Sequence, residues 1–488
     1  MRLGLQHSYA ALPDRFFARV APTPVADPKL VALNSGLALE LGLDPRLLEP
    51  EAAAMLSGNR IPEDAEPIAM AYAGHQFGGF VPSLGDGRAI LLGEIKGRDG
   101  ILRDVQLKGA GLTRFSRGGD GRAALGPMLR EYLISEAMHA LGVPTTRSLA
   151  VVTTGEQVFR EGALPGAVLT RVATSHIRVG TFQYFAARGD EEGVRTLLEY
   201  VIARHYPEAR DTAVPALSVL RSIAQRQAAL IADWMALGFI HGVMNTDNMS
   251  VAGETIDYGP CAFMDEYDPN TVFSSIDHRG RYAFANQPAI AQWNLARLAE
   301  TLLPLIDPET EKAIALATGA LEPFIAEFET RFLARMRRKI GLADAAEGDA
   351  DLVKRLLAAM AQSHADFTLT FRRLALVAER PDEEPRLREL FAQPADIDSW
   401  LCDWRTLVAR DGRGTRERVA GMHAASPAYI PRNHRVQIAL DAAEAGDYEP
   451  FRALLGVLQD PFDERSDGGP YSGPPRPEER VLRTFCGT

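Results

Sequence analysis

The chain has 488 residues, of which 46% are hydrophobic, so it is long enough for about three domains or two large lobes around a substantial core. Its 53 Lys and Arg residues stand against 64 Asp and Glu residues, and the net charge of −11 argues against a general nucleic-acid or anionic-membrane partner. The three widely spaced cysteines are too few for a disulfide framework or a zinc knuckle, and they favour a reducing compartment.

The N-terminal region lacks targeting features. Its first ten residues, MRLGLQHSYA, do not contain a basic stretch followed by an apolar one, and no run of about 18 uncharged apolar residues occurs in the chain. We therefore expect a cytoplasmic protein without a membrane span. Residues 1–66 combine short apolar patches with several prolines, which indicates an N-terminal extension rather than a separate domain.

The hydrophobic pattern then changes twice along the chain. Residues 67–173 contain short strand-like segments broken by glycine, with one helix, which is typical of a small mixed sheet. Residues 174–459 are predominantly helical, with helical patterns at 215–238, 290–305, 311–336, 351–377 and 435–458. Residues 460–488 are rich in Pro, Gly and Ser, and we expect a flexible tail there. This order predicts an α+β fold with a small mixed-sheet lobe and a large helical lobe.

A strand and the helix after it carry a candidate ion pair. The segment DVQLKG, residues 104–109, alternates so that Lys108 lies on the face opposite the core, where a lysine suits phosphate contact. A helix predicted over residues 127–142 carries Glu131 and Glu136, and either carboxylate qualifies as the partner of the lysine. Glu131 is preferred because it lies in the first turns, where the helix dipole favours a carboxylate.

Two glycine-rich loops are candidates for contact with phosphates. LGDGR, residues 84–88, connects two strand candidates, and SRGGDGR occupies residues 116–122. Glycine lets the backbone approach a phosphate closely, so Asp120 and Gly121 could contact a nucleotide, although plain turns are the alternative. Basic residues cluster in the same region and suit a polyanion such as a nucleotide triphosphate, or else a solvated face: Arg103, Lys108, Arg114, Arg117, Arg122 and Arg130.

The most specific segment is HGVMNTDN at residues 241–248, followed by IDYG at 256–259. In protein kinases the loop H-R-D-x-x-x-x-N supplies a base Asp and a metal-binding Asn, and a later D-F-G Asp holds magnesium. Asn248 and Asp257 match the two metal ligands, whose oxygen donors suit Mg²⁺. Val243 stands at the base position and cannot accept a proton, whereas Asp247 lies beside the asparagine. The chain is therefore predicted to hold metal-bound ATP but need not perform ordinary phosphoryl transfer.

Two arginines are candidates for the terminal phosphates. Arg171 and Arg178 flank the segment TSHI near the expected junction of the lobes, where guanidinium groups could grip phosphates or form ordinary salt bridges. His241 is interpreted as a structural histidine that holds its loop.

Long runs of the sequence resemble a known family. These runs are YAGHQFGGFVPSLGDGRA, QLKGAGLTRFSRGGDGRA, LTRVATSHIRVGTFQ and HGVMNTDNMSVAGETIDYGPCAFMDEYDP, and they cover much of residues 72–269. They resemble the selenoprotein O family, also called YdiU, a set of kinase-like proteins. The resemblance implies a two-lobed protein-kinase-like fold and an enzyme that transfers AMP from ATP to Ser, Thr or Tyr hydroxyls of proteins, with Mg²⁺ or Mn²⁺. It also implies that the nucleotide is inverted relative to ordinary kinases.

The resemblance further implies roles for individual residues. Lys108 and Glu131 resemble the family's ion pair, and Asp247 resembles its proton acceptor. Asn248 and Asp257 resemble the metal ligands. The other positions that resemble the nucleotide site are Gly85, Gly87, Arg88, Asp120, Gly121, Arg171 and Arg178. The implied partners are proteins with hydroxyl side chains, redox-related proteins among them, and the enzyme itself, with no nucleic acid and no membrane.

Two other functions stay open from the sequence. One is a kinase-like phosphotransferase that uses Asp247 as an offset base, and Val243 counts against it. The other is a non-catalytic ATP-binding scaffold, and the retained pair of Asn248 and Asp257 counts against it.

A redox hypothesis concerns the cysteines. Cys261 follows the IDYG segment, and Cys486 lies in the tail, where members of the family often carry a cysteine or selenocysteine. Under this hypothesis oxidation joins Cys261 to Cys486 and lets the tail modulate the site, although Cys402 is an alternative partner.

Overall fold

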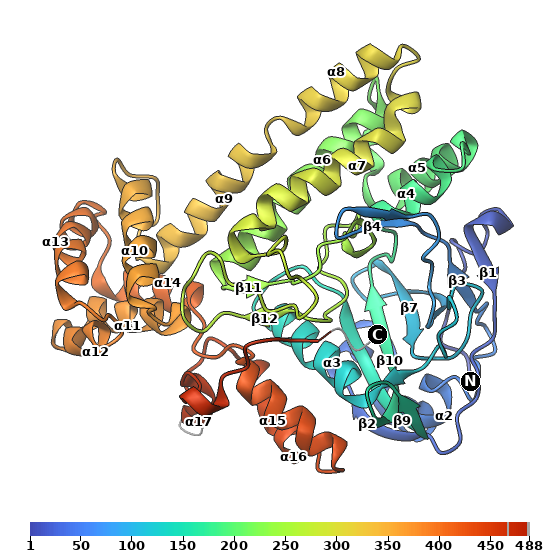
Figure 1. Ribbon diagram of the computed structural model, residues 1–488, viewed down its shortest axis with the longest axis horizontal. Coiled ribbons are helices and arrows are strands. Elements are labelled where there is room, and N and C mark those ends of the chain that lie inside the picture. Colours follow the sequence, from blue (N-terminus) through green and yellow to red (C-terminus); the bar gives the residue numbers. More distant parts are fainter. Residues whose placement is uncertain (466–467, 486–488) are drawn as a thin grey trace.

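The computed structural model describes residues 1–465 and 468–485, and Figure 1 shows a sheet within the N-terminal half and a largely helical C-terminal half. The main sheet has eight strands in the order β1-β3-β6-β7-β10-β9-β2, with β8 paired to β10. Its strands are β1 (Phe17–Arg19), β2 (Lys29–Leu33), β3 (Ile68–Met70), β6 (Ala89–Lys96), β7 (Leu102–Lys108), β8 (Ala123–Ala124), β9 (Arg147–Phe159) and β10 (Ala163–Ala173). The expected division into a sheet-containing part and a helical part is confirmed.

The strand pairs of this sheet are all antiparallel, so the expectation of a mixed sheet was wrong. The physical reason is the tight connections: β6 and β7, like β9 and β10, follow one another through short turns, which join antiparallel neighbours. Residues 1–66 contribute β1 and β2 to this same sheet. The division between an N-terminal extension and the next lobe at residue 66 stays a prediction.

Helices cover both faces of the sheet. Helices α1 (Ser35–Glu40) and α2 (Pro45–Leu56) bury Leu37 and Leu48 in one core, which also takes the inward residues Val105 and Leu107 of β7. Helix α3 (Leu125–Ala140) packs on β9 and β10 across the sheet. The predicted alternation of β7 is confirmed, because Lys108 lies on the face opposite Leu107. One face of β7 thus holds the core and the other holds Lys108.

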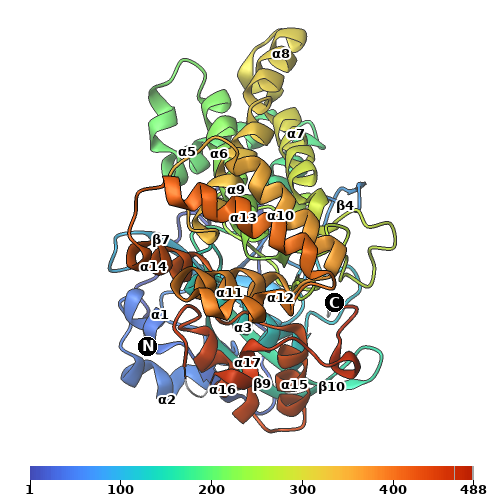
Figure 2. The same cartoon turned by 90° about the vertical axis from the view of Figure 1, so that its left-hand side faces the viewer.

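The helical half is built from helices that run in sequence order (Figure 1). They are α4 (Val179–Ala186), α5 (Glu191–His205), α6 (Pro215–Ala236), α7 (Gln287–Ile306), α8 (Thr310–Leu321), α9 (Phe324–Lys339), α10 (Asp349–Ser363), α11 (Phe367–Glu379), α12 (Glu384–Arg388), α13 (Pro394–Arg410), α14 (Thr415–Ala425), α15 (Asn433–Glu444), α16 (Glu449–Leu458) and α17 (Gly469–Ser472). Helices α10 to α14 gather at the end of the molecule remote from the sheet in Figure 1, and this end faces the viewer in Figure 2.

Two of the helical patterns are interrupted. The pattern at 311–336 divides into α8 and α9 at Pro323, and the pattern at 351–377 divides at His364, whose left-handed φ of 51° ends α10. Helix α6 behaves as predicted: it begins with Pro215 and ends before Gly238, which has a φ of +72°. It leads the chain through β11 (Phe239–Ile240) directly into His241, and β11 pairs with β12 (Ala262–Phe263).

The chain end returns to the junction of the two halves. Thr484 donates its backbone N–H to Phe273 O at 2.7 Å, and its own carbonyl accepts from Ser275 N at 3.0 Å. A small hairpin, β4 (Gly74–Gln76) and β5 (Gly79–Val81), packs through β4 on α4 and on the turn Thr246–Asn248. Within the described residues, we find no helix with both the length and the apolar character needed to cross a membrane.

Candidate active site

A cavity of about 630 Å³ lies between the sheet and the segment that follows α6. All of the predicted site residues line it: Gly85, Gly87, Arg88, Lys108, Asp120, Gly121, Glu131, Arg171, Arg178, Asp247, Asn248 and Asp257. The loops after β5 and β7, helix α3, the segment 241–260 and the chain end all contribute to its walls. Residues more than 150 positions apart in the sequence are therefore brought to one place by the fold.

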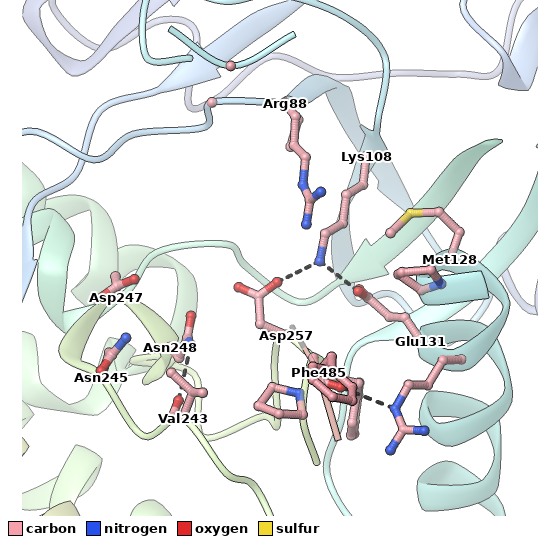
Figure 3. A pocket seen from close by; sticks show the side chains of 18 of the residues that line it. Arg88, Lys108, Met128, Glu131, Val243, Asn245, Asp247, Asn248, Asp257 and Phe485 are labelled. Carbon is pink, nitrogen blue, oxygen red and sulfur yellow. Dashed lines mark hydrogen bonds and ion pairs between the residues drawn. The ribbon is translucent and has the colours of Figure 1, made fainter. Parts of the chain in front are cut away.

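A buried ion cluster forms one wall of the cavity (Figure 3). Lys108 Nζ, at the end of β7, lies 2.6 Å from Glu131 Oε2 and 2.8 Å from Asp257 Oδ1. Arg171 of β10 donates from Nε to Glu131 Oε1 at 2.7 Å and from Nη2 to Asp257 Oδ1 at 2.6 Å. Glu136 lies elsewhere and pairs with Arg147 at 2.8 Å. The structure thus brings Glu131, and not Glu136, to Lys108.

The cluster fixes the charge of its carboxylates. Burial alone would raise the pKa of Asp257, but the Arg171 and Lys108 cations hold that pKa well below its usual range. The same two cations lower the pKa of Glu131 against its own burial. Both carboxylates are therefore ionised at neutral pH, and each is compensated by two cations at hydrogen-bond distance.

Asp257 also has an unusual backbone conformation. Its φ is 65°, in the left-handed region that residues other than glycine rarely adopt. The ion pairs to Lys108 and Arg171 hold the side chain there. Backbone strain of this kind concentrates at functional sites, where the surroundings enforce it.

Arg178 reaches into the cavity with few partners. Its guanidinium lies over the ring of Tyr72, 4.3 Å from the centroid, and its nearest carboxylates, Asp86 and Asp257, are both 3.9 Å away. Its Nε is buried and has no hydrogen-bond partner among the described residues. Asp86 is held by Gln106 Nε2 at 3.1 Å. Sequence reasoning missed Tyr72 and Asp86, although Asp86 stands between the two glycines of the loop LGDGR.

The loop 243–248 carries the remaining polar groups. Asn248 donates from Nδ2 to Val243 O at 3.1 Å, which turns its oxygen toward the cavity (Figure 3). Asp247 is buried, accepts from Gln76 Nε2 at 3.2 Å through Oδ2, and has no partner for Oδ1 in the described part of the chain. Burial raises the pKa of this carboxyl to about 6. His241 lies 2.9 Å from Ile256 O through its Nε2 and is fully buried, which fits a structural histidine.

The two glycine-rich loops pack against each other at the mouth of the cavity. A Cβ at Gly85, which has a φ of +62°, would lie 2.2 Å from the Phe115 ring, and a Cβ at Gly121 would lie 2.2 Å from the Gly111 backbone. Only glycine fits at either position. Asp120 forms an ion pair with Arg160 at 2.8 Å, and Arg88 lines the cavity beside Lys108 (Figure 3).

The donor set suits a hard divalent cation. The described residues hold no group of three or more His, Cys, Asp or Glu side chains placed to bind a metal. Asn248 and Asp257 nevertheless present oxygen atoms to the same cavity, as Figure 3 shows. Magnesium is commonly held by one or two protein groups together with phosphate oxygens, and these two residues fit that requirement.

The cysteines give no direct support to a disulfide. Cys261 is buried and free, and burial raises the pKa of its thiol to about 11. Cys402 is exposed and free. Cys486 lies outside the described residues, so the pairing of Cys261 with Cys486 stays a prediction.

A Lys–Glu ion pair and an Asn–Asp pair that face one cavity are typical of a nucleotide-dependent transferase. The family model described as "Protein adenylyltransferase SelO" matches residues 1–459. Relatives named "Protein nucleotidyltransferase YdiU" are similar along their whole length. The one from Rhizobium rhizogenes is 60% identical over 99% of this chain and 96% of its own. Those from Rhizobium meliloti and Bradyrhizobium sp. strain BTAi1 are 60% and 61% identical, over 99% of both chains in each case.

The chain therefore belongs to the SelO family of protein adenylyltransferases. This confirms the family that the sequence motifs predicted, and the enzyme class with it.

Proposed function

We propose that this protein transfers AMP from ATP to Ser, Thr or Tyr hydroxyls of other proteins and of itself, with release of pyrophosphate and with help from Mg²⁺ or Mn²⁺. The proposal rests on the segment that corresponds to the catalytic loop of kinases. Val243 stands at the position of the kinase base, and the buried carboxylate of Asp247 lies in the same cavity as Lys108 and its ion-pair partners. The proposal includes a kinase-like arrangement, with an extension at residues 1–66, an N-lobe at 67–173, a helical C-lobe at 174–459 and a tail from residue 460.

The triphosphate binds at the cationic side of the cavity. Arg171 and Arg178 are buried there and Lys108 is partly buried, and guanidinium groups bind phosphate oxygens in a fixed geometry. Arg178 is the best placed to accept a new partner, because its nearest carboxylates are 3.9 Å away. Gly85, Gly87, Arg88, Asp120 and Gly121 line the rest of the nucleotide site.

A divalent cation is held by Asn248 and Asp257 together with the phosphates. When bound, it neutralises the charge that develops between the α-phosphate and the leaving pyrophosphate. The ion pairs to Lys108 and Arg171 keep the Asp257 carboxylate in the cavity.

Asp247 accepts the proton of the acceptor hydroxyl. Gln76 holds Oδ2 at 3.2 Å, while Oδ1 is buried beside Gly74 and has no hydrogen-bond partner among the described residues. A carboxylate whose pKa is raised to about 6 is a stronger base than an ordinary aspartate and is still mostly ionised at neutral pH. Protein acceptors and a cytoplasmic location complete the proposal, and three scattered cysteines support the location.

Incubation with ATP labelled on the α- or the γ-phosphate tests the proposal. We expect α-label on protein and free pyrophosphate. Transfer of γ-label with ADP as the product would instead establish a phosphotransferase that uses Asp247 as an offset base. Absence of both labels, together with ATP binding in a nucleotide titration, would establish an ATP-binding scaffold.

A further inference from the structure

The β4–β5 hairpin packs on the loop that carries Asp247. His75 N donates to Thr246 Oγ1 at 2.7 Å, and Gln76 holds Asp247. At the tip, Phe77 has a left-handed φ of 51°, and its N–H lies 3.1 Å from Asn245 Oδ1 and 3.2 Å from the hydroxyl of Tyr282. A bulky residue in this conformation is strained, so the surroundings hold Phe77 in place against a cost.

The strained backbone presents an aromatic ring at the mouth of the cavity. Phe77 lines the cavity, packs on Tyr282 with centroids 5.1 Å apart, and is still 37% exposed. Ile276 also lines the cavity and is 50% exposed. Phe80, at 41% exposure, lies outside this surface, because its ring packs on His75, 4.9 Å between centroids. Large apolar side chains that gather at the mouth of a cavity suit a partner surface.

The loop beside this apolar surface is positively charged. Arg279 is exposed and forms no ion pair with a described residue. Arg281 lies over Trp293, 4.8 Å from the ring centroid, and also has no carboxylate partner in the described part of the chain. Asp277 is the one acid among residues 276–282, and its carboxylate accepts hydrogen bonds from the backbone N–H groups of Arg281 and Tyr282. In a chain with a net charge of −11, these unpaired cations are locally suited to an acidic partner.

We propose that Phe77, Ile276, Arg279 and Arg281 form the docking surface for the acceptor protein. The occupant is an extended segment in which an apolar side chain neighbours the hydroxyl residue and an acidic side chain lies nearby. The apolar side chain packs on Phe77 and Ile276, and the acidic one meets Arg279 and Arg281. This inference rests on the proposed AMP transfer, because it places the hydroxyl next to Asp247, which the same hairpin holds through Gln76.

Synthetic peptides test this surface with the full-length enzyme and α-labelled ATP. The first peptide carries Leu beside the acceptor and Asp nearby, the second replaces Leu by Gly, and the third replaces Asp by Lys. Each is made with Ser, Thr and Tyr as the acceptor. We expect the first peptide to be labelled most efficiently, by about tenfold in kcat/KM.

Matched variants assign the effect to residues. Phe77→Ala should raise the KM for the first peptide about tenfold with little change in the KM for ATP, and Phe77→Leu should restore most of the affinity. Arg279→Ala should remove the preference for Asp over Lys. Leu47→Ala on α2 and Arg98→Ala in the β6–β7 turn truncate exposed side chains remote from the cavity, and should change neither constant.

The outcomes separate this inference from the proposed function. Equal labelling of the three peptides, an unchanged peptide KM in Phe77→Ala, or labelling of the enzyme itself but of no peptide would each overturn the docking surface and leave AMP transfer intact. Absence of α-label from every protein and peptide would contradict AMP transfer itself.

Discussion

At the scale of single residues, Asp247 combines burial, an unpaired oxygen and a position in the cavity. We predict that Asp247→Asn lowers kcat by about a hundredfold or more, because a proton acceptor acts in the transition state. The affinity for ATP should change little, since Asp247 has no ion pair with the cationic cluster. Single-turnover rates and nucleotide titrations measure the two effects, with the exposed Asp99→Asn as a control. Wild-type turnover in Asp247→Asn would remove this residue from the mechanism.

The neighbourhood of Asp247 leaves no room for even one methyl group. A Cβ at Gly74 would lie 2.5 Å from Asp247 Oδ1 and 2.9 Å from its Cβ, whereas a Cβ at Gly79 would meet only Gln76 O at 3.5 Å. We predict that Gly74→Ala displaces Asp247 and lowers turnover at least tenfold, while Gly79→Ala in the same hairpin keeps nearly full activity. Parallel activity and thermal-melting measurements test this pair. Equal activity in the two variants would contradict the packing described here.

Single residues also show where sequence reasoning stops. The motifs were sufficient to name Lys108, Asp247, Asn248 and Asp257, and all four line one cavity. They could not name Tyr72 or Asp86, because a tyrosine over an arginine has no spacing signature. The roles of all these residues stay predictions.

At the scale of elements, β7 and α3 were predictable because their signals are local. The alternation of β7 and the Gly stop after α3 are both present in the sequence, and Gly142 has the expected positive φ of 79°. The antiparallel order of the sheet was not predictable in the same way. It depends on pairing between segments as distant as β2 and β9, whose register no local pattern specifies.

Helix α9 ends in a lysine whose charge opposes folding. Lys339 is 3% exposed, lies over Phe371 at 5.1 Å, and forms no ion pair with a described residue. Burial lowers its pKa from 10.5 to about 7. Between these two values the unfolded chain binds more protons than the folded one, so stability from this group rises with pH across that window.

We therefore predict that Lys339→Met stabilises the protein most below pH 7, by on the order of 3 kcal/mol. The stabilisation by Lys339→Met should shrink as the pH rises toward 10. The folded lysine is neutral above about pH 7, and the lysine of the unfolded chain loses its proton near 10.5. Denaturant unfolding of both proteins at pH 6, 8 and about 10 measures the difference. The exposed Lys312→Met serves as the control. A gain that does not depend on pH, or a loss at pH 6, would show that Lys339 is stabilised by contacts other than those described.

At the scale of the whole molecule, the cavity exists only because the two halves of the chain meet. Lys108 and Glu131 come from the sheet and α3, whereas Asp247 and Asp257 come from the segment after α6 (Figures 1 and 3). The chain end adds Thr484 and Phe485 to the same walls. Sequence patterns predicted the two halves, and the family resemblance implied that their residues share one site; the structure shows that these residues line one cavity.

The central claim is that this cavity transfers AMP rather than phosphate. The most direct test is intact mass spectrometry of the enzyme and of an added acceptor protein after incubation with ATP and Mg²⁺ or Mn²⁺, for the wild type and for Asp257→Ala. We predict that the wild type adds the mass of one AMP group per modified site, and that Asp257→Ala adds none, because it lacks a cation ligand and the partner of Lys108. A gain equal to one phosphate group, or an equal gain of AMP in Asp257→Ala, would contradict the account.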